Sequence, residues 1–122
     1  IQDPAEMDRI DAGFRELSVA DEHIRVELTG SWNRPPMNPN ELSEKLFEHA
    51  KAAAQEHGRT LEGTSVGGVS DANFVSALGK PVLDGLGAVG AGPHSRDEHV
   101  VPSESPGQIA TLATLISNLR DF

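Results

Sequence analysis

The sequence predicts a mixed fold, in which a small α+β unit precedes a layered α/β domain. A helix followed by a half-buried strand is expected before residue 30, and strands alternate with helices after residue 40. The segment between these regions, Gly30 to Asn40, contains three prolines and keeps neither a helical nor a strand period. We interpret this segment as a crossing between two domains.

The first region is expected to contain one helix and one strand. Asp3 and Pro4 form a typical helix start, and apolar residues at helical spacing then predict a helix over about residues 4–17. Apolar and polar residues alternate from Ile24 to Leu28, and this period of two predicts a strand that ends at Gly30.

The second region is expected to open with a helix from Asn40 to about His57. Its apolar residues recur on one face, and Gly58 is typical of a C-terminal stop. A strand near Leu61 to Val66 is expected to follow this helix, and the short apolar run from Pro81 to Leu86 predicts another. This alternation of strands with helices implies the layered α/β domain.

Two further helices are predicted by the residues at their starts. A glycine turn leads to Ser70 or Asp71, either of which can cap a short helix. The last helix has Ser105 as its expected cap, Pro106 at the first position and Gln108 closing a capping box. Its expected apolar stripe consists of Ile109, Leu112, Ala113, Ile116 and Leu119.

Composition excludes several classes of partner and chemistry. Ten Lys and Arg against nineteen Asp and Glu give a net charge of −9, which repels phosphate backbones and anionic lipids. We therefore expect neither nucleic acid nor a membrane surface as a partner. The lack of cysteine excludes disulfides, thiolate zinc sites and a cysteine nucleophile.

The apolar stretches are too short for a membrane span, which needs roughly 18 residues, and the N-terminus lacks a signal-peptide pattern. We expect a soluble chain with a cytoplasmic location. Because the chain begins without a methionine, we also expect that its first residue is not the native start, and export stays open.

His94 is the candidate metal ligand of the chain. It lies in a glycine-rich loop after a predicted strand, and such loops often present the neutral imidazole that binds metals. The alternative is a histidine that is solvated or hydrogen-bonded locally, because no H-E-x-x-H pattern accompanies it. The nearby Asp97 and Glu98 are expected to orient backbone rather than to bind metal.

Two candidate anion sites lie elsewhere in the sequence. The pair Gly67-Gly68 exposes backbone N–H groups before Ser70 and could seat a carboxylate or phosphate, although a tight turn is the alternative. Arg34 stands among rigid prolines, where its guanidinium could grip a carboxylate in bidentate fashion. The alternative for Arg34 is a solvated linker residue.

Three features, taken in order, resemble a known family. They are NRPPM at residues 33–37, GGVSDANFVSALGKPVLDGLGAVGAGPHSRDEHV at residues 67–100, and a closing amphipathic helix. Together they resemble the C-terminal part of the zinc metallopeptidases and amidohydrolases that include glutamate carboxypeptidase, acetylornithine deacetylase and succinyl-diaminopimelate desuccinylase. The resemblance implies that residues 1–35 end a lid or dimerisation domain and that residues 36–122 form the C-terminal part of a catalytic zinc-peptidase domain.

The same resemblance implies roles for single residues. His94 matches a zinc ligand, Arg34 matches the lid arginine that holds the substrate carboxylate, and Gly68 and Ser70 match the turn that lines the substrate pocket. The implied reaction is attack on an amide by a water that bridges two zinc ions, and cobalt or manganese would also suit such a site.

The remaining metal ligands and the glutamate base have no matching motif in these residues, so we expect the chain alone to be inactive. Its parent is expected to act on a small peptide or an N-acyl amino acid. We also expect a homodimer or association with a missing N-terminal part. Two alternatives stay open: a non-catalytic module that binds small anions, and a dimerisation module on the same scaffold.

Overall fold

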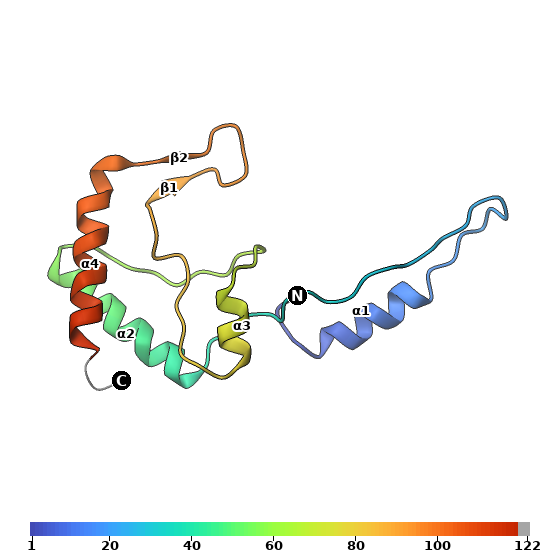
Figure 1. Ribbon diagram of the computed structural model, residues 1–122, viewed down its shortest axis with the longest axis horizontal. Coiled ribbons are helices and arrows are strands. Elements are labelled where there is room, and N and C mark those ends of the chain that lie inside the picture. Colours follow the sequence, from blue (N-terminus) through green and yellow to red (C-terminus); the bar gives the residue numbers. More distant parts are fainter. Residues whose placement is uncertain (120–122) are drawn as a thin grey trace. The chain divides into compact units, whose positions relative to one another are not determined.

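The computed structural model describes residues 1–119, which contain four α-helices, a short 3-10 helix and a two-stranded sheet (Figure 1). The chain divides into two compact units. The first unit comprises Ile1–Asn38 and Gly67–Lys80. The second unit comprises Pro39–Val66 and the described residues from Pro81 onward. Helices therefore dominate a mixed architecture whose sheet is small.

The first helix, α1, spans Glu6–Arg15 and confirms the helix predicted near the start of the chain. The Asp3 side chain accepts the N–H of Ala5 at 2.9 Å just ahead of it. On its surface, the Arg9 guanidinium is hydrogen-bonded to Glu6, which lowers the pKa of that carboxyl. The ionised pair therefore supports the helix at neutral pH and is lost as Glu6 becomes protonated in acid.

The strand predicted from Ile24 to Leu28 is wrong, because the described residues form no ladder there. The three apolar side chains of this segment are 54%, 49% and 55% exposed. A period of two defines one apolar face, but a strand also needs a neighbour for its N–H and C=O groups. The described part of the chain provides no such neighbour, so the pattern alone does not make a strand.

Helix α3 spans Ala72–Ala77 and follows the glycine turn as predicted. Of the two candidate caps, Ser70 is the one that acts, because its hydroxyl accepts the N–H of Ala72 at 3.1 Å. The Asn73 side chain in turn accepts the N–H of Ser70 at 2.9 Å. Gly79 follows the helix with a φ of 69°, a left-handed conformation that glycine adopts without strain.

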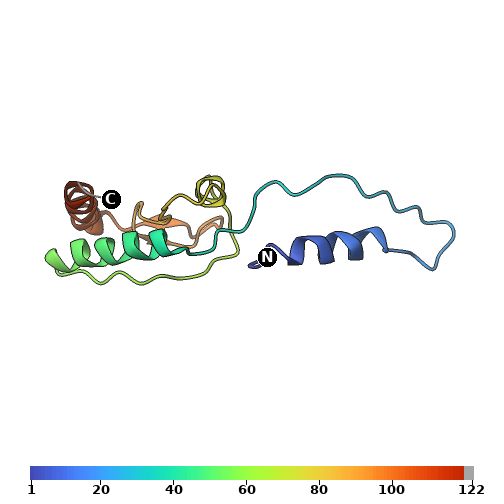
Figure 2. The ribbon, with the colours of Figure 1, turned by 90° about the horizontal axis from the view of Figure 1, so that it is seen from below.

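The core of the second unit lies between α2, Glu41–Glu56, and α4, Ser105–Asn118, which pack side by side in both views (Figures 1 and 2). As predicted, Asn40 precedes α2, and its side chain caps the helix by accepting the N–H of Ser43 at 2.8 Å. The buried cluster at this contact consists of Ala50, Ala53 and Leu115, with Leu46, Leu61, Leu83, Leu86 and Leu119 packed around it.

The start of α4 differs from the predicted capping box. Ser105 is the first residue of the helix rather than its cap, and a 3-10 turn, η1 at Pro102–Glu104, precedes it. The Gln108 side chain does not turn back to Ser105. Its Nε2 donates to the carbonyl of Leu86 at 2.8 Å, so it holds the neighbouring segment instead.

The buried face of α4 also differs from the predicted stripe. Thr111 and Leu115 are buried, whereas Ile109 and Ile116 are 66% and 71% exposed. The helix has apolar residues on more than one face, so its spacing did not define which face would meet α2. The face with Leu115 packs against Ala50 and Ala53 of α2, and the described residues leave the face with Ile109 and Ile116 exposed.

The strands predicted near residues 61–66 and 81–86 are also wrong within the described part of the chain. The second segment is held by side chains rather than by a ladder, since its Val82 N–H donates to the Ser43 hydroxyl at 3.3 Å. A parallel sheet needs neighbouring strands on both sides, and none of them lies among residues 1–119. The layered α/β sheet is therefore not observed there.

The observed sheet is an antiparallel pair of two-residue strands, β1 at Gly90–Ala91 and β2 at His99–Val100. Gly90 lies opposite Val100, and a Cβ atom at Gly90 would come within 2.1 Å of the His99 carbonyl oxygen. Glycine is thus required at this position. Among the described residues, no helix is long and apolar enough to cross a membrane.

Leu115→Ala tests the core between α2 and α4. Leu115 is 5% exposed, and its truncation leaves a cavity, so the free energy of unfolding should fall by about 2–4 kcal/mol. Ile116→Ala is the matched control, because its side chain is 71% exposed on the same helix. Denaturant unfolding of both variants measures the difference, and an equal loss in the two would contradict this core.

Candidate functional site

Arg34, a predicted substrate-binding residue, lies against α3 in the first unit. Its Nη2 donates to Asp71 Oδ1 at 3.0 Å, and its guanidinium carbon lies 5.2 Å from the centre of the Phe74 ring. The Arg34 side chain is 29% exposed and that of Asp71 is 91% exposed. The guanidinium is therefore half-buried, and its carboxylate partner faces solvent.

The Nε of Arg34 is buried and has no hydrogen-bond acceptor among the described residues. A guanidinium presents five N–H donors in a planar fork that matches a carboxylate. A buried donor without a partner costs about 1–3 kcal/mol, a cost that an acceptor reaching it would remove. Arg34 therefore retains donor capacity beyond its bond to Asp71.

Gly68 and Ser70 lie in the turn before α3, in the same unit as Arg34. Gly68 is exposed, and a Cβ atom there would meet nothing within 4 Å among the described residues. The N–H of Ser70 is already bonded to Asn73, and the N–H of Ala72 to the Ser70 hydroxyl. These bonds support the tight-turn interpretation, and a pocket-lining role of Gly68 and Ser70 stays a prediction.

The structure joins the Arg34 segment to α3 by a second link that the sequence did not reveal. Asn73 is 6% exposed, and its Nδ2 donates to the carbonyl of Pro35 at 2.8 Å. Asn73 and Phe74 were both missed as candidates. The available signal was the i, i+3 spacing of Asp71 and Phe74, which places them on one face of a short helix.

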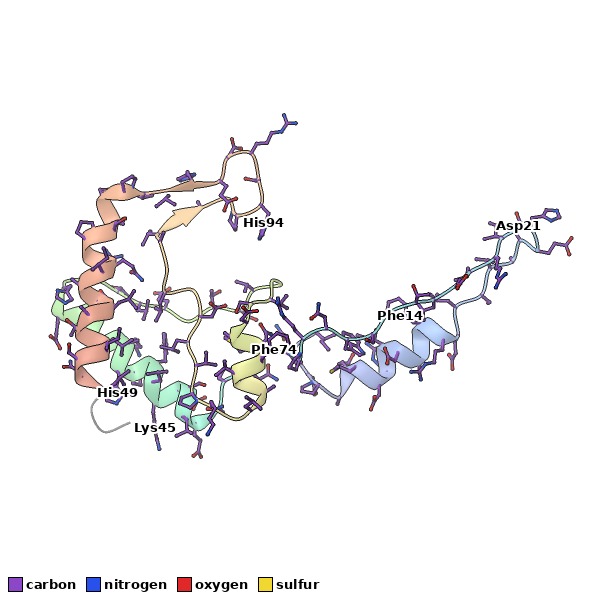
Figure 3. All side chains as sticks on the ribbon, in the orientation of Figure 1. Phe14, Asp21, Lys45, His49, Phe74 and His94 are labelled. Atoms are coloured by element: carbon purple, nitrogen blue, oxygen red, sulfur yellow. The ribbon has the colours of Figure 1, made fainter. Side chains whose placement is uncertain are left out.

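His94 lies in the loop between β1 and β2, where Figure 3 labels it. Its φ is 64°, a left-handed conformation that is uncommon outside glycine. Its main-chain N–H donates to Glu98 Oε2 at 3.1 Å, which confirms that this acidic residue orients backbone. The imidazole of His94 belongs to an exposed residue.

The His94 loop is braced by a serine and a glycine. The Ser95 hydroxyl donates to the carbonyl of Gly92 at 2.8 Å and accepts the N–H of Asp97 at 3.2 Å. Gly92 has a φ of 68°, and a Cβ atom there would lie 2.9 Å from the Ser95 Oγ. The loop therefore holds His94 in its strained conformation through a defined set of short contacts.

Residues 1–119 contain no group of three His, Asp or Glu side chains that could hold a metal ion. A zinc site needs three or four such ligands. His94 fits as one accessible imidazole, but the residues described do not complete a metal centre. Its role as a ligand stays a prediction.

Comparison with known proteins decides the family. The model of peptidase family M20/M25/M40 matches residues 3–118. This chain belongs to peptidase family M20/M25/M40. It is 32% identical over 117 residues to carboxypeptidase G2 from Pseudomonas sp. (strain RS-16). The match covers 94% of this chain and 28% of the carboxypeptidase, and no solved structure matches. The family predicted from the sequence is confirmed.

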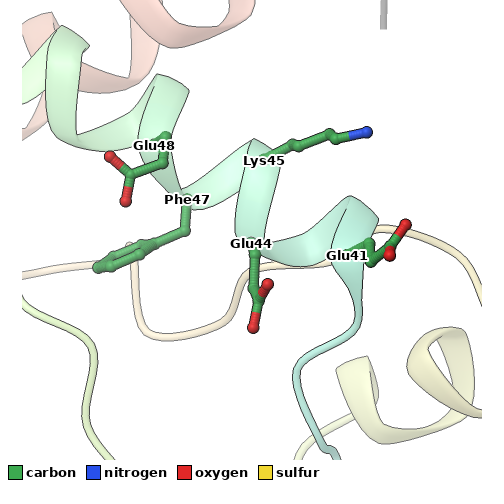
Figure 4. Close-up of a pocket in the computed structure, with 5 residues that line it drawn as sticks. All are labelled: Glu41, Glu44, Lys45, Phe47 and Glu48. Carbon is green, nitrogen blue, oxygen red and sulfur yellow. The ribbon is translucent and has the colours of Figure 1, made fainter.

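A shallow surface depression of this M20/M25/M40 chain lies along α2 (Figure 4). Its lining comes entirely from that helix and consists of Glu41, Glu44, Lys45, Phe47 and Glu48. A depression formed by one helix face does not enclose a ligand, and no predicted site residue lines it. The candidate functions therefore rest on Arg34 and His94.

His94→Gly tests the strain in the loop. A left-handed φ costs an ordinary residue roughly 1–2 kcal/mol, and the extra entropy of unfolded glycine offsets about 0.5–1 kcal/mol of that. The variant should therefore gain up to about 1.5 kcal/mol in its free energy of unfolding when no metal is bound. Gly92→Ala, which adds both strain and crowding, should lose stability. Denaturant unfolding compares them, and a loss in both variants would show that His94 is not strained.

Proposed function

We propose that this chain supplies the C-terminal part of a metal-dependent hydrolase, a carboxypeptidase or deacylase that cleaves an amide bond next to a free carboxylate. Membership of a peptidase family supports hydrolysis, and the name of the related carboxypeptidase supports cleavage beside a carboxylate. The observation that carries the proposal is Arg34, a half-buried guanidinium that already binds the carboxylate of Asp71. Arginine suits this task because its fork matches both carboxylate oxygens.

The chain spans 28% of the length of carboxypeptidase G2, so the whole active site is proposed to need residues beyond these. His94 would hold one of two zinc ions, with cobalt or manganese as acceptable replacements. When bound, the metals would activate a bridging water and polarise the amide carbonyl. The proposed substrates are small peptides or N-acyl amino acids.

The proposed division of labour follows the family resemblance. Residues 1–35 are proposed as the end of a lid or dimerisation domain, and residues 36–122 as the C-terminal part of the catalytic domain. Arg34 stands at the end of the lid segment and would hold the substrate carboxylate. A homodimer, or association with the rest of the protein, is proposed as the working assembly.

A second candidate is a non-catalytic module that binds a small anion on the same scaffold. It is favoured by two observations on the described residues: the Arg34 guanidinium has donor capacity left, and no group of three potential metal ligands lies around His94. The two candidates differ in their response to a chelator. Amide hydrolysis would stop when metal is removed, whereas anion binding by Arg34 alone would continue.

Arg34→Lys and Arg34→Ala test the carboxylate assignment in the whole protein. A charged hydrogen bond contributes about 1.5–3 kcal/mol, so kcat/KM for an N-acyl amino acid should fall by about ten- to a hundred-fold. Lysine should rescue little, because it lacks the planar fork. Arg25→Ala, an exposed arginine of the same unit, is the control. Unchanged kcat/KM in both Arg34 variants would remove Arg34 from substrate binding.

A further inference from the structure

The Arg34 side chain contacts Asp71, the residue just before α3, and Phe74 within that helix. The Asp71 carboxylate accepts one guanidinium N–H at 3.0 Å, and the Phe74 ring lies 5.2 Å from the guanidinium carbon. A separation below about 6 Å is typical of a cation–π interaction. Asp71 has helical backbone angles at the N-cap of α3, and Phe74 follows three residues later, so both contacts come from the first turn of this helix and its cap.

The same helix also holds the backbone that carries Arg34. The Asn73 amide donates to the carbonyl of Pro35 at 2.8 Å, and its Oδ1 accepts the N–H of Ser70 at 2.9 Å. Asn73 is 6% exposed, so these two bonds are largely shielded from water. The ring of Pro35 fixes the φ angle of that residue, which limits the backbone conformations directly after Arg34.

The two partners of the ion pair, Arg34 and Asp71, differ in their exposure to solvent. The Arg34 side chain is 29% exposed, while its Asp71 partner is 91% exposed. An ion pair open to water is weak and yields readily to a competing anion. Asp71 and Phe74 therefore orient the guanidinium in the absence of a ligand. Because Asp71 is exposed to solvent, an incoming carboxylate can approach the guanidinium from that side.

We propose that Asp71 and Phe74 are positioning residues that fix the Arg34 guanidinium for the carboxylate of the substrate. This inference rests on the proposed function of Arg34. A free arginine side chain loses much rotamer freedom when it binds a ligand, and ordering it beforehand spares the ligand that cost. The clamp of Asp71 and Phe74 thus contributes to the preference for a free carboxylate over a neutral group.

The test compares two matched substrates with the whole protein: an N-acyl amino acid with a free carboxylate, and the same compound as its carboxamide. The readout is the ratio of kcat/KM for the first to that for the second. Asp71→Asn removes the charge, and Phe74→Leu removes the ring face while keeping an apolar side chain. Each should lower the ratio by about two- to ten-fold, the range expected for one such contact.

Three controls separate positioning from a merely structural role. Val75→Ala changes a 40% exposed residue of the same helix and should leave the ratio unchanged. The conservative variants Asp71→Glu and Phe74→Tyr keep the charge and the ring, so they should retain most of the ratio even where another variant folds poorly. In an Arg34→Lys background, Asp71→Asn and Phe74→Leu should lower the ratio no further.

The outcomes distinguish the clamp from the function on which it rests. If Arg34→Lys lowers the ratio but Asp71→Asn and Phe74→Leu do not, the clamp is wrong and the function of Arg34 stands. If Arg34→Lys itself leaves the ratio unchanged, the proposed carboxylate binding fails. Equal losses for both substrates would mean a structural role, and a raised ratio in Asp71→Asn would mean that Asp71 competes with the substrate; either result overturns the proposal.

Discussion

The close approach of α2 and α4 organises the second unit. It depends on small side chains, because Ala50 and Ala53 leave room for Leu115 to enter the contact. Helix α4 also holds the chain before and after the two-stranded sheet. Before β1, the carbonyl of Leu86 accepts a hydrogen bond from Gln108, and after β2 the chain continues through η1 into α4. The loop with His94 is thus attached to a packed pair of helices rather than to a large sheet.

A half-buried arginine after the C-terminal end of α2 also connects this helix to η1 and α4. Arg59 follows α2 and donates from Nη1 to Glu104 Oε2 at 2.7 Å, and from Nη2 to Gln108 Oε1 at 3.4 Å. It passes so close to Gly107 that a Cβ atom there would lie 2.6 Å from its Nη1. Glycine in the first turn of α4 therefore has a packing reason. The carboxylate of Glu104 thereby binds Arg59, which links η1 to the end of α2.

The sequence predicted the helices well and the strands poorly, and the reason is physical. A helix satisfies its own backbone hydrogen bonds, so caps such as Asn40 and stops such as Gly58 predict it locally. A strand needs a partner, and apolar alternation at Ile24–Leu28 could not supply one. Arg34 and His94 were named as candidate site residues from motifs, and their roles stay predictions. The residues that contact the Arg34 segment, Asn73 and Phe74, were not foreseen, because contacts across 38 and 40 positions of sequence leave no local pattern.

We propose that the whole protein to which this M20/M25/M40 chain belongs is a metal-dependent hydrolase, with His94 as one of its metal ligands. The most direct measurement is the zinc content of the whole protein and of its His94→Ala variant, together with N-acyl amino acid hydrolysis before and after chelation. This proposal predicts about two zinc ions in the native protein, fewer in the variant, and hydrolysis that stops on chelation and returns with zinc. Equal zinc content in both proteins, or hydrolysis that survives chelation, would contradict it.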